Sequence, residues 1–273
     1  MMAMHLRRTA AIVLRYLYLL RGSPARVFPL FAWVAIDILL WGFMTRYLNT
    51  ITTKGVDLVT TLLGAVLLWD FFTRVMQGVT MAFFEDVWSR NFLNIFASPL
   101  SIAEYLSGLV VTSIGTSLIG LVVMLVLATT VFGLSFLSCG LLLIPFLMIL
   151  FFFGIALGIL GCSIVLRFGP AAEWFIWPLP AVVSPFVGVF YPIATLPVWM
   201  QWGAYGLPPS YVFQGLRLVV AGGTGAAGVG VSLAWGGALD AVYLGIACAV
   251  FLRVHRQAVR TGLIARYSAE SLN

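Results

Sequence analysis

Charged side chains inside long apolar runs are the residues of this sequence that could do chemistry. Asp37, Asp70, Arg74 and Asp240 each lie within a predicted membrane span. An unpaired charge costs at least ~2.5–3.5 kcal/mol there, so each needs a partner, water or a function. Asp70 and Arg74 are four residues apart on one helix and can pair directly, whereas Asp37 and Asp240 have no partner nearby in sequence. We interpret the four as candidates for a polar translocation path, and a role in helix packing is the alternative for each.

Residue patterns typical of catalysis, metal binding or redox chemistry do not occur. The three cysteines, Cys139, Cys162 and Cys248, are far apart in apolar surroundings without a CxxC spacing. No GxxxxGK[ST] phosphate-binding loop is present. We therefore expect no catalytic, metal or cofactor site in the chain. Its energy should come from a separate subunit or from an ion gradient.

Composition identifies the bilayer as the main solvent. The chain has 273 residues, of which 62% are hydrophobic and 9% are charged, against roughly 45–50% apolar and about 25% charged in soluble domains. We expect a single transmembrane domain over residues 1–273. The net charge of +6 is expected to reflect basic residues near the membrane ends and not nucleic-acid binding.

Apolar runs of suitable length predict six membrane spans in an all-α protein. These are residues 28–46, 58–83, 105–132, 141–166, 172–192 and 229–252. An even number puts both termini on one side, where eleven Lys and Arg residues fall against three on the other. Because basic residues gather in cytoplasmic segments, both termini should be cytoplasmic.

The segments outside the spans have their own patterns. Residues 1–27 should hold a helix lying in the membrane surface, because apolar residues recur at helical spacing and Arg8 and Arg15 share another face. Those apolar residues are Leu6, Ala10, Val13, Leu17 and Leu20. The start of a first span is the alternative interpretation of residues 10–20. Residues 253–273 are expected to form a cytoplasmic tail.

Residues 85–104 form the most informative segment. Phe84, Trp88, Phe92, Ile95 and Phe96 fall at helical spacing, which predicts a short amphipathic helix on the cytoplasmic side. Ser98-Pro99 should end that helix. Ser101 and Glu104 then form a capping box at the start of the third span. The sequence therefore predicts a defined corner between a cytoplasmic helix and a transmembrane helix.

The longest external segment, residues 193–228, is rich in proline and aromatic residues. We expect short re-entrant helices there, because irregular backbone at membrane depth must pack against protein or line a cavity.

Two motifs resemble a known family. "SPLSIAEYLSG" (residues 98–108) and "SPFVGVFYPIATLPVWMQWGAYGLPPSYVFQGLR" (residues 184–217) are similar to the ABC-2 type membrane subunits of ATP-binding-cassette exporters. The resemblance implies two such subunits, identical or related, and two separate ATPase subunits that bind ATP and Mg.

The resemblance also implies roles for particular residues. The helix around residues 85–97 would be a coupling helix seated in a groove of the ATPase, and the fifth span would end at an outer gate. The coupling residues would be Glu85, Asp86, Trp88, Arg90, Phe92, Phe96, Ser98, Pro99 and Glu104, and the gate residues Phe190, Tyr191 and Pro192. The alternative is that the aromatic side chains of residues 84–96 lie among lipid headgroups and contact no partner.

The expected function is that of a permease subunit in a bacterial-type plasma (inner) membrane, most simply a homodimer. It would export an amphipathic or hydrophobic substrate, such as a lipid, a glycolipid or polysaccharide, or a drug-like molecule. Two alternatives are a transporter driven by an ion gradient and a membrane scaffold that does not transport. ATP dependence and the presence of an ATPase partner distinguish the three.

Overall fold

The computed structural model describes residues 2–51, 62–89, 94–95, 98–133, 143–220 and 226–263. Within these ranges every regular element is a helix and no strand occurs. The predicted all-α class is therefore confirmed. In chain order the helices are α1 (Met2–Arg21), α2 (Pro24–Ile51), α3 (Gly64–Trp88), α5 (Ile102–Phe132), α6 (Leu143–Phe168), the 3-10 helix η3 (Pro170–Phe175), α7 (Leu179–Val187), the 3-10 helix η4 (Ile193–Thr195), α8 (Val198–Tyr205), α9 (Pro208–Val220) and α10 (Ala226–Arg260).

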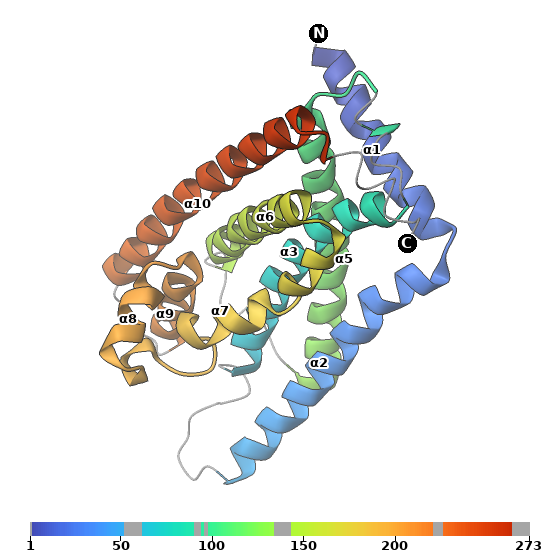
Figure 1. Cartoon of the computed structure of the whole chain (residues 1–273). Coiled ribbons are helices and arrows are strands. Elements are labelled where there is room, and N and C mark those ends of the chain that lie inside the picture. Colours follow the sequence, from blue (N-terminus) through green and yellow to red (C-terminus); the bar gives the residue numbers. More distant parts are fainter. Residues whose placement is uncertain are drawn as a thin grey trace.

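The long helices pack side by side with α6 and α3 at the centre (Figure 1). Helix α6 packs against α10 on one side and against α3 on the other, and α3 in turn packs against α5. Helices α1 and α2 lie on α5. Aromatic rings fill the α3–α6 contact, where Phe72 and Phe153 stack with their centroids 5.4 Å apart.

Glycines on α6 allow this close approach to α3. A Cβ atom at Gly154 would lie 2.9 Å from Val75 Cβ, and one at Gly158 would lie 2.8 Å from Val79 Cβ. At Gly161 it would lie 3.0 Å from a methyl carbon of Ile176. Small residues at a helix contact let the backbones approach. The three glycines therefore let α6 pack closely against α3 and against Ile176 after η3.

Four of the described helices are long and apolar enough to cross a membrane, namely Pro24–Ile51, Ile102–Phe132, Leu143–Phe168 and Gly228–Arg260. Their outer faces carry exposed apolar side chains, such as Trp33 on α2 (63% exposed) and Val122 on α5 (58% exposed). Such surfaces suit lipid or another apolar protein face. Helix α3 has 25 residues, but Asp70 and Arg74 make it less apolar.

The long helices extend beyond several predicted spans. The expected first span, residues 28–46, lies inside α2, and the third and fourth correspond to α5 and α6. Helix α10 runs to Arg260, so residues 253–260, which we assigned to the tail, continue the last long helix. Apolar periodicity locates the centre of a buried helix better than its ends, because the terminal turns are polar.

The prediction of one continuous helix over residues 172–192 is wrong. The chain there forms η3, a turn, the nine-residue helix α7, and then a loop after Gly188. Pro178 precedes α7, and Gly188 ends it with a left-handed backbone at φ 70°. Proline lacks the N–H that a helix needs and restricts the residue before it, so a proline-rich apolar run forms short helices.

The segment expected to be re-entrant contains two short helices, α8 and α9, which lie beside α7 (Figure 1). Helix α9 also packs against α10 and α6. Tyr211 on α9 donates a hydrogen bond to the carbonyl oxygen of Tyr205 over 3.0 Å. This bond ties α9 to the end of α8.

Helix α1 is separate from α2, and the chain turns at Gly22 and Ser23. Part of its predicted apolar face is turned away from the rest of the chain, with Leu6 74% and Leu17 51% exposed, whereas Leu20 packs against the core. Tyr16 on the opposite side is buried, and Ile12 packs against Gly108 of α5. The helix therefore directs apolar side chains outward and its arginine-bearing face toward α5.

Candidate functional site

The candidate site is the corner at which the chain passes from α3 to α5. Helix α5 begins with the predicted capping box, in which Glu104 N–H donates to Ser101 Oγ over 3.3 Å and Ser101 N–H donates to Glu104 Oε2 over 2.7 Å. Leu100 N–H donates to the carbonyl oxygen of Ser98 over 2.7 Å. These bonds fix the direction in which the chain enters α5.

The expected amphipathic helix differs from the structure at its beginning. Helix α3 continues without a break to Trp88 and is followed by Ser89, so residues 85–88 are its last turn. Phe84 is buried in the core at 1% exposure, and Glu85 and Asp86 are 8% and 1% exposed. Both acids therefore face the interior of this chain. Arg90, Phe92 and Phe96 lie outside the described residues.

Asp86 is held by two side chains from other helices. Tyr105 of α5 donates its hydroxyl hydrogen to Asp86 Oδ2 over 2.8 Å. The guanidinium of Arg15 on α1 contacts Asp86 Oδ1. A buried carboxylate needs such compensation, because an unpaired one is strongly destabilising.

The two neighbouring acids are compensated in the same way. Arg26 Nε lies 3.0 Å from Glu85 Oε1. Glu104 Oε1 lies 2.5 Å from His5 Nδ1 and 3.5 Å from Arg8 Nη1. We define the acidic cluster as Glu85, Asp86 and Glu104, and its bases come from α1 and the first turn of α2.

The sequence does not show that these basic residues pair with the acidic cluster. The seven-residue spacing of Arg8 and Arg15 puts both on one face of α1. By itself this spacing indicates only the polar face of a surface helix. Asp86 lies 71 residues after Arg15 and Glu104 lies 96 residues after Arg8, so no local pattern shows which helix face these acids meet.

Burial also affects two ionisable groups of α1. It lowers the pKa of the Arg15 guanidinium, an effect opposed by the charges of Tyr105 and Glu85. Burial, with a smaller contribution from the charge of Glu85, raises the pKa of Tyr16 to about 12. The α1 face toward the corner is therefore a partly dehydrated contact, in which charged groups depend on one another.

Trp88 is the exposed member of the predicted coupling residues on α3. Its side chain is 46% exposed, and its indole Nε1–H donates to Glu173 Oε2 on η3 over 2.9 Å. Trp174 and Phe175 of η3 are 74% and 75% exposed. Together with the exposed Ser98 and Pro99, they give this end of the molecule an uncovered surface.

Of the four charged residues predicted within spans, Asp37, Asp70 and Arg74 lie together and Asp240 lies apart from them. Arg74 interacts electrostatically with Asp70 on its own helix and with Asp37 on α2. The aliphatic part of Arg74 lies across α5, where a Cβ at Gly120 would be 2.9 Å from Arg74 Cδ. Asp240 is not part of this group. It lies on α10, is 4% exposed, and neither carboxylate oxygen has a hydrogen-bond partner among the described residues.

The expected outer-gate residues lie in the loop after α7. The ring of Phe190 stacks on Trp41 of α2 with centroids 4.8 Å apart. The hydroxyl of Tyr191 donates to the carbonyl oxygen of Pro185 over 2.8 Å. Arg217 on α9 donates to the carbonyl oxygens of Gly188 and Val189. Pro192 is exposed and precedes η4. The loop is thus held by α2 and α9.

Among the described residues no group of three or more His, Cys, Asp and Glu side chains could hold a metal ion. The acidic cluster is neutralised by nearby bases, and its carboxylates are buried. The corner offers an exposed surface made of Trp88 at the end of α3, Ser98 and Pro99 before α5, and the neighbouring aromatic residues of η3.

Long apolar helices with charges gathered between them define a membrane-embedded protein. The model of the family described as ABC-2 type transporter matches residues 24–220. The chain therefore belongs to the ABC-2 type transporter family. The match begins at the first residue of α2 and ends at the last residue of α9. A search among curated proteins finds no match. The family consists of membrane permeases that work in general with an ATPase subunit.

Proposed function

We propose that this chain is the permease subunit of an exporter, which moves an amphipathic or hydrophobic substrate outward with energy from ATP hydrolysed elsewhere. Two copies of the chain would form the membrane part as a homodimer. Two separate ATPase subunits would bind ATP and Mg. The family match over residues 24–220 carries this proposal.

In the proposed arrangement the exposed part of the corner contacts the ATPase. Trp88, Ser98 and Pro99 would form the contact, because aromatic side chains that fill a partner's pocket often dominate binding energy. The ion pairs of the buried acids would transmit movement of the corner to α1 and α2. These acids are Glu85, Asp86 and Glu104. Movement of the ATPase would then reach four helices at once, α1, α2, α3 and α5.

The proposed topology has six crossings with both termini cytoplasmic. Gly169 has a left-handed backbone at φ 99° directly after α6, which favours a sharp reversal. Residues 170–192 would return as a crossing made of short pieces. The acidic cluster and α1 would then lie on the cytoplasmic side, and α8 and α9 would enter the outer leaflet.

Surface labelling tests this topology. In a chain without its native cysteines, Asn94→Cys should react with a membrane-impermeant thiol reagent only after the membrane is opened. Thr50→Cys, which replaces an exposed residue at the outer end of α2, should react in intact cells. The reverse pattern contradicts the proposed orientation.

Copurification and vesicle transport test the proposed activity. A tagged chain should bring down an ATPase subunit, and inverted vesicles that contain both should accumulate substrate only with ATP. Trp88→Ala should reduce coupled transport strongly and Trp88→Phe weakly, since phenylalanine keeps most of the buried ring. Trp202→Ala on α8 is the matched control. Transport that persists without the ATPase favours an ion gradient.

A further inference from the structure

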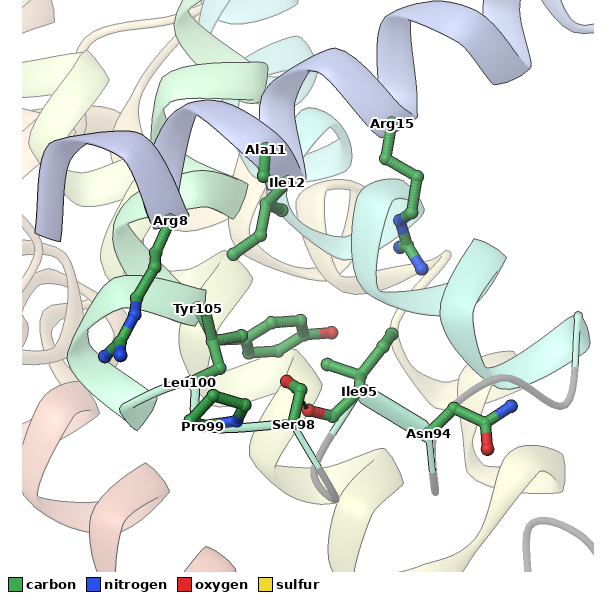
Figure 2. A pocket seen from close by; sticks show the side chains of 10 residues that line it. All are labelled: Arg8, Ala11, Ile12, Arg15, Asn94, Ile95, Ser98, Pro99, Leu100 and Tyr105. Atoms are coloured by element: carbon green, nitrogen blue, oxygen red, sulfur yellow. Dashed lines mark hydrogen bonds between the residues drawn. The ribbon is translucent and has the colours of Figure 1, made fainter. Parts of the chain in front are cut away.

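A cavity of about 380 Å³ lies between α1 and the corner. Helix α1 contributes Arg8, Ala11, Ile12 and Arg15, which recur every three or four residues and thus share one face. The opposite wall is formed by residues 94–95 and 98–100, and Tyr105 closes the cavity from α5. Figure 2 shows Arg8 at one end and Arg15 at the other, with the ring of Tyr105 between them.

The two arginines present positive charge to this cavity. Their side chains are 29% and 32% exposed, whereas Glu104 and Asp86, which they contact, are 4% and 1% exposed. The acids therefore lie behind the arginines, and a molecule that enters meets guanidinium groups first. Between them the lining is apolar, with Ile12, Pro99 and Leu100.

Arg8 is better placed than Arg15 to bind an anion. Arg15 lies against Asp86, but the contact of Arg8 Nη1 with Glu104 Oε1 is 3.5 Å long. Glu104 also accepts from His5 and from the backbone of Ser101, so it does not depend on Arg8. A guanidinium has five N–H donors in a planar fork. Arg8 can therefore give two of them to one phosphate.

We propose that this cavity binds the phosphate headgroup of an anionic phospholipid, with Arg8 as the phosphate ligand. Free phosphate would make the same contacts with Arg8, but the position of the cavity beside a membrane-surface helix favours a lipid. Helix α1 exposes Leu6, Leu14 and Leu17 on its other side, which suits a helix in the membrane surface. The cavity then lies at headgroup depth, where anionic lipids are attracted to basic segments.

The size and lining of the cavity fit the headgroup end of such a lipid. Small-molecule sites commonly have volumes of about 300–1,000 Å³, and this cavity is near the lower end. It can hold a phosphate and glycerol, whose carbons would contact Ile12 and Leu100, while the acyl chains remain outside. Arg8 and Arg15 are seven residues apart, or about 10.5 Å along the helix, so one phosphate reaches only one of them.

Lipid binding by the full chain tests the proposal without reference to transport. The chain in zwitterionic detergent is titrated with phosphatidylglycerol, with phosphatidylcholine and with inorganic phosphate. Bound lipid is counted by native mass spectrometry, and the unfolding midpoint is recorded. Phosphatidylglycerol should bind in a one-to-one complex and raise the midpoint. Neither phosphatidylcholine nor inorganic phosphate should do so at the same concentration.

Three variants locate the binding. Arg8→Gln should weaken phosphatidylglycerol binding by about tenfold or more, because it removes a charge-assisted contact. Ala11→Trp should abolish binding by filling the cavity while keeping both arginines. Arg7→Gln is the matched control, since Arg7 is exposed and does not line the cavity. Arg8→Lys should retain part of the affinity.

Several results would overturn the proposal. One is unchanged phosphatidylglycerol binding in both Arg8→Gln and Ala11→Trp, which would put the lipid elsewhere. Equal stabilisation by inorganic phosphate would make this a site for a free anion. If Ala11→Trp releases an ATPase subunit but leaves lipid binding intact, the cavity is part of a protein interface. Because binding is measured on the chain alone, loss of ATP-driven transport has no bearing on these outcomes.

Discussion

Tyr105 donates a hydrogen bond of 2.8 Å to Asp86 and thereby joins the first turn of α5 to the last turn of α3. Both side chains are almost fully buried, with exposures of 0% and 1%. The two ends of the corner are thus tied directly to each other. A force on the residues between Asp86 and Tyr105 therefore acts on both α3 and α5. The two helices cannot separate at this point without exposing the buried carboxylate of Asp86.

The contact between Arg15 and Asp86 predicts strong non-additivity. Arg15→Gln leaves a buried carboxylate with only Tyr105, and loss of one partner of a buried pair typically costs about 3–5 kcal/mol. Asp86→Asn should be milder, because Arg15 is 32% exposed and water can reach it. The measurement is the free energy of unfolding in detergent for both single variants and the double variant.

The double variant provides the control. Arg15→Gln combined with Asp86→Asn should be more stable than Arg15→Gln alone, since no charge is left uncompensated. Simple addition of the two losses would contradict the proposed role of this ion pair.

The glycine contact between α6 and α3 predicts a position-specific effect of size. Gly158→Leu should destabilise the chain by roughly 1–3 kcal/mol or more, because even its Cβ would lie 2.8 Å from Val79 Cβ. Gly115→Leu on α5 serves as control, since nothing lies within 4 Å of a Cβ there. Thermal unfolding of the two variants checks the prediction, and equal midpoints would argue against tight packing at Gly158.

The loop after α7 should depend on Arg217. This side chain donates to two carbonyl oxygens just beyond the helix, at Gly188 and Val189, where positive charge also interacts favourably with the helix dipole. Arg217→Gln should increase hydrogen exchange in residues 188–192. Arg46→Gln, which changes an exposed arginine on α2, should leave exchange in that loop unchanged.

Gly188→Ala tests the same loop through its backbone. Gly188 has φ 70°, and a Cβ there would lie 2.9 Å from Ile193 Cγ1. A left-handed backbone costs an L-residue roughly 1–2 kcal/mol. We expect lower thermal stability than in Gly245→Ala, since a Cβ at that position in α10 has nothing within 4 Å. An unfolding midpoint of Gly188→Ala equal to that of the wild type would contradict this prediction, because the loop would then accommodate the Cβ without strain.

Tyr16 predicts a loss of stability at alkaline pH. Burial raises its pKa from 10.0 to about 12, so the folded state holds the neutral hydroxyl more tightly than the unfolded state does. The associated stability is complete below about pH 10 and is lost as the pH rises toward 12, by at most about 3 kcal/mol. Tyr16→Phe should reduce this loss. Identical pH dependence of unfolding in the variant would rule out Tyr16 as its source.

Local signals in the sequence predicted several parts of the structure correctly. The two capping hydrogen bonds join Ser101 and Glu104, three residues apart, so a four-residue pattern suffices to predict the cap of α5. The apolar runs over residues 105–132 and 141–166 likewise coincide with α5 and α6, because a long apolar helix is recognised from its own residues. The helices against which they pack did not follow from the sequence.

The remaining features depend on contacts between distant parts of the chain. Asp86 is buried because Arg15 and Tyr105 reach it, and its own neighbours in sequence predicted an exposed position. The fifth run was apolar enough to suggest a span, but Pro178, Pro180 and Pro185 limit it to short helices. The hydrophobicity of a segment indicates whether lipid or protein surrounds it, whereas its prolines and glycines determine where its helices begin and end.

The basic face of α1 also bears on how the protein is made. Helix α1 is synthesised before α3 and α5, yet its arginines contact acids at residues 86 and 104. Until those residues have been synthesised, Arg8 and Arg15 lack the two carboxylates that they contact in the folded chain. Docking of α1 onto the corner would therefore come late in biogenesis, after α3 and the beginning of α5 have been made.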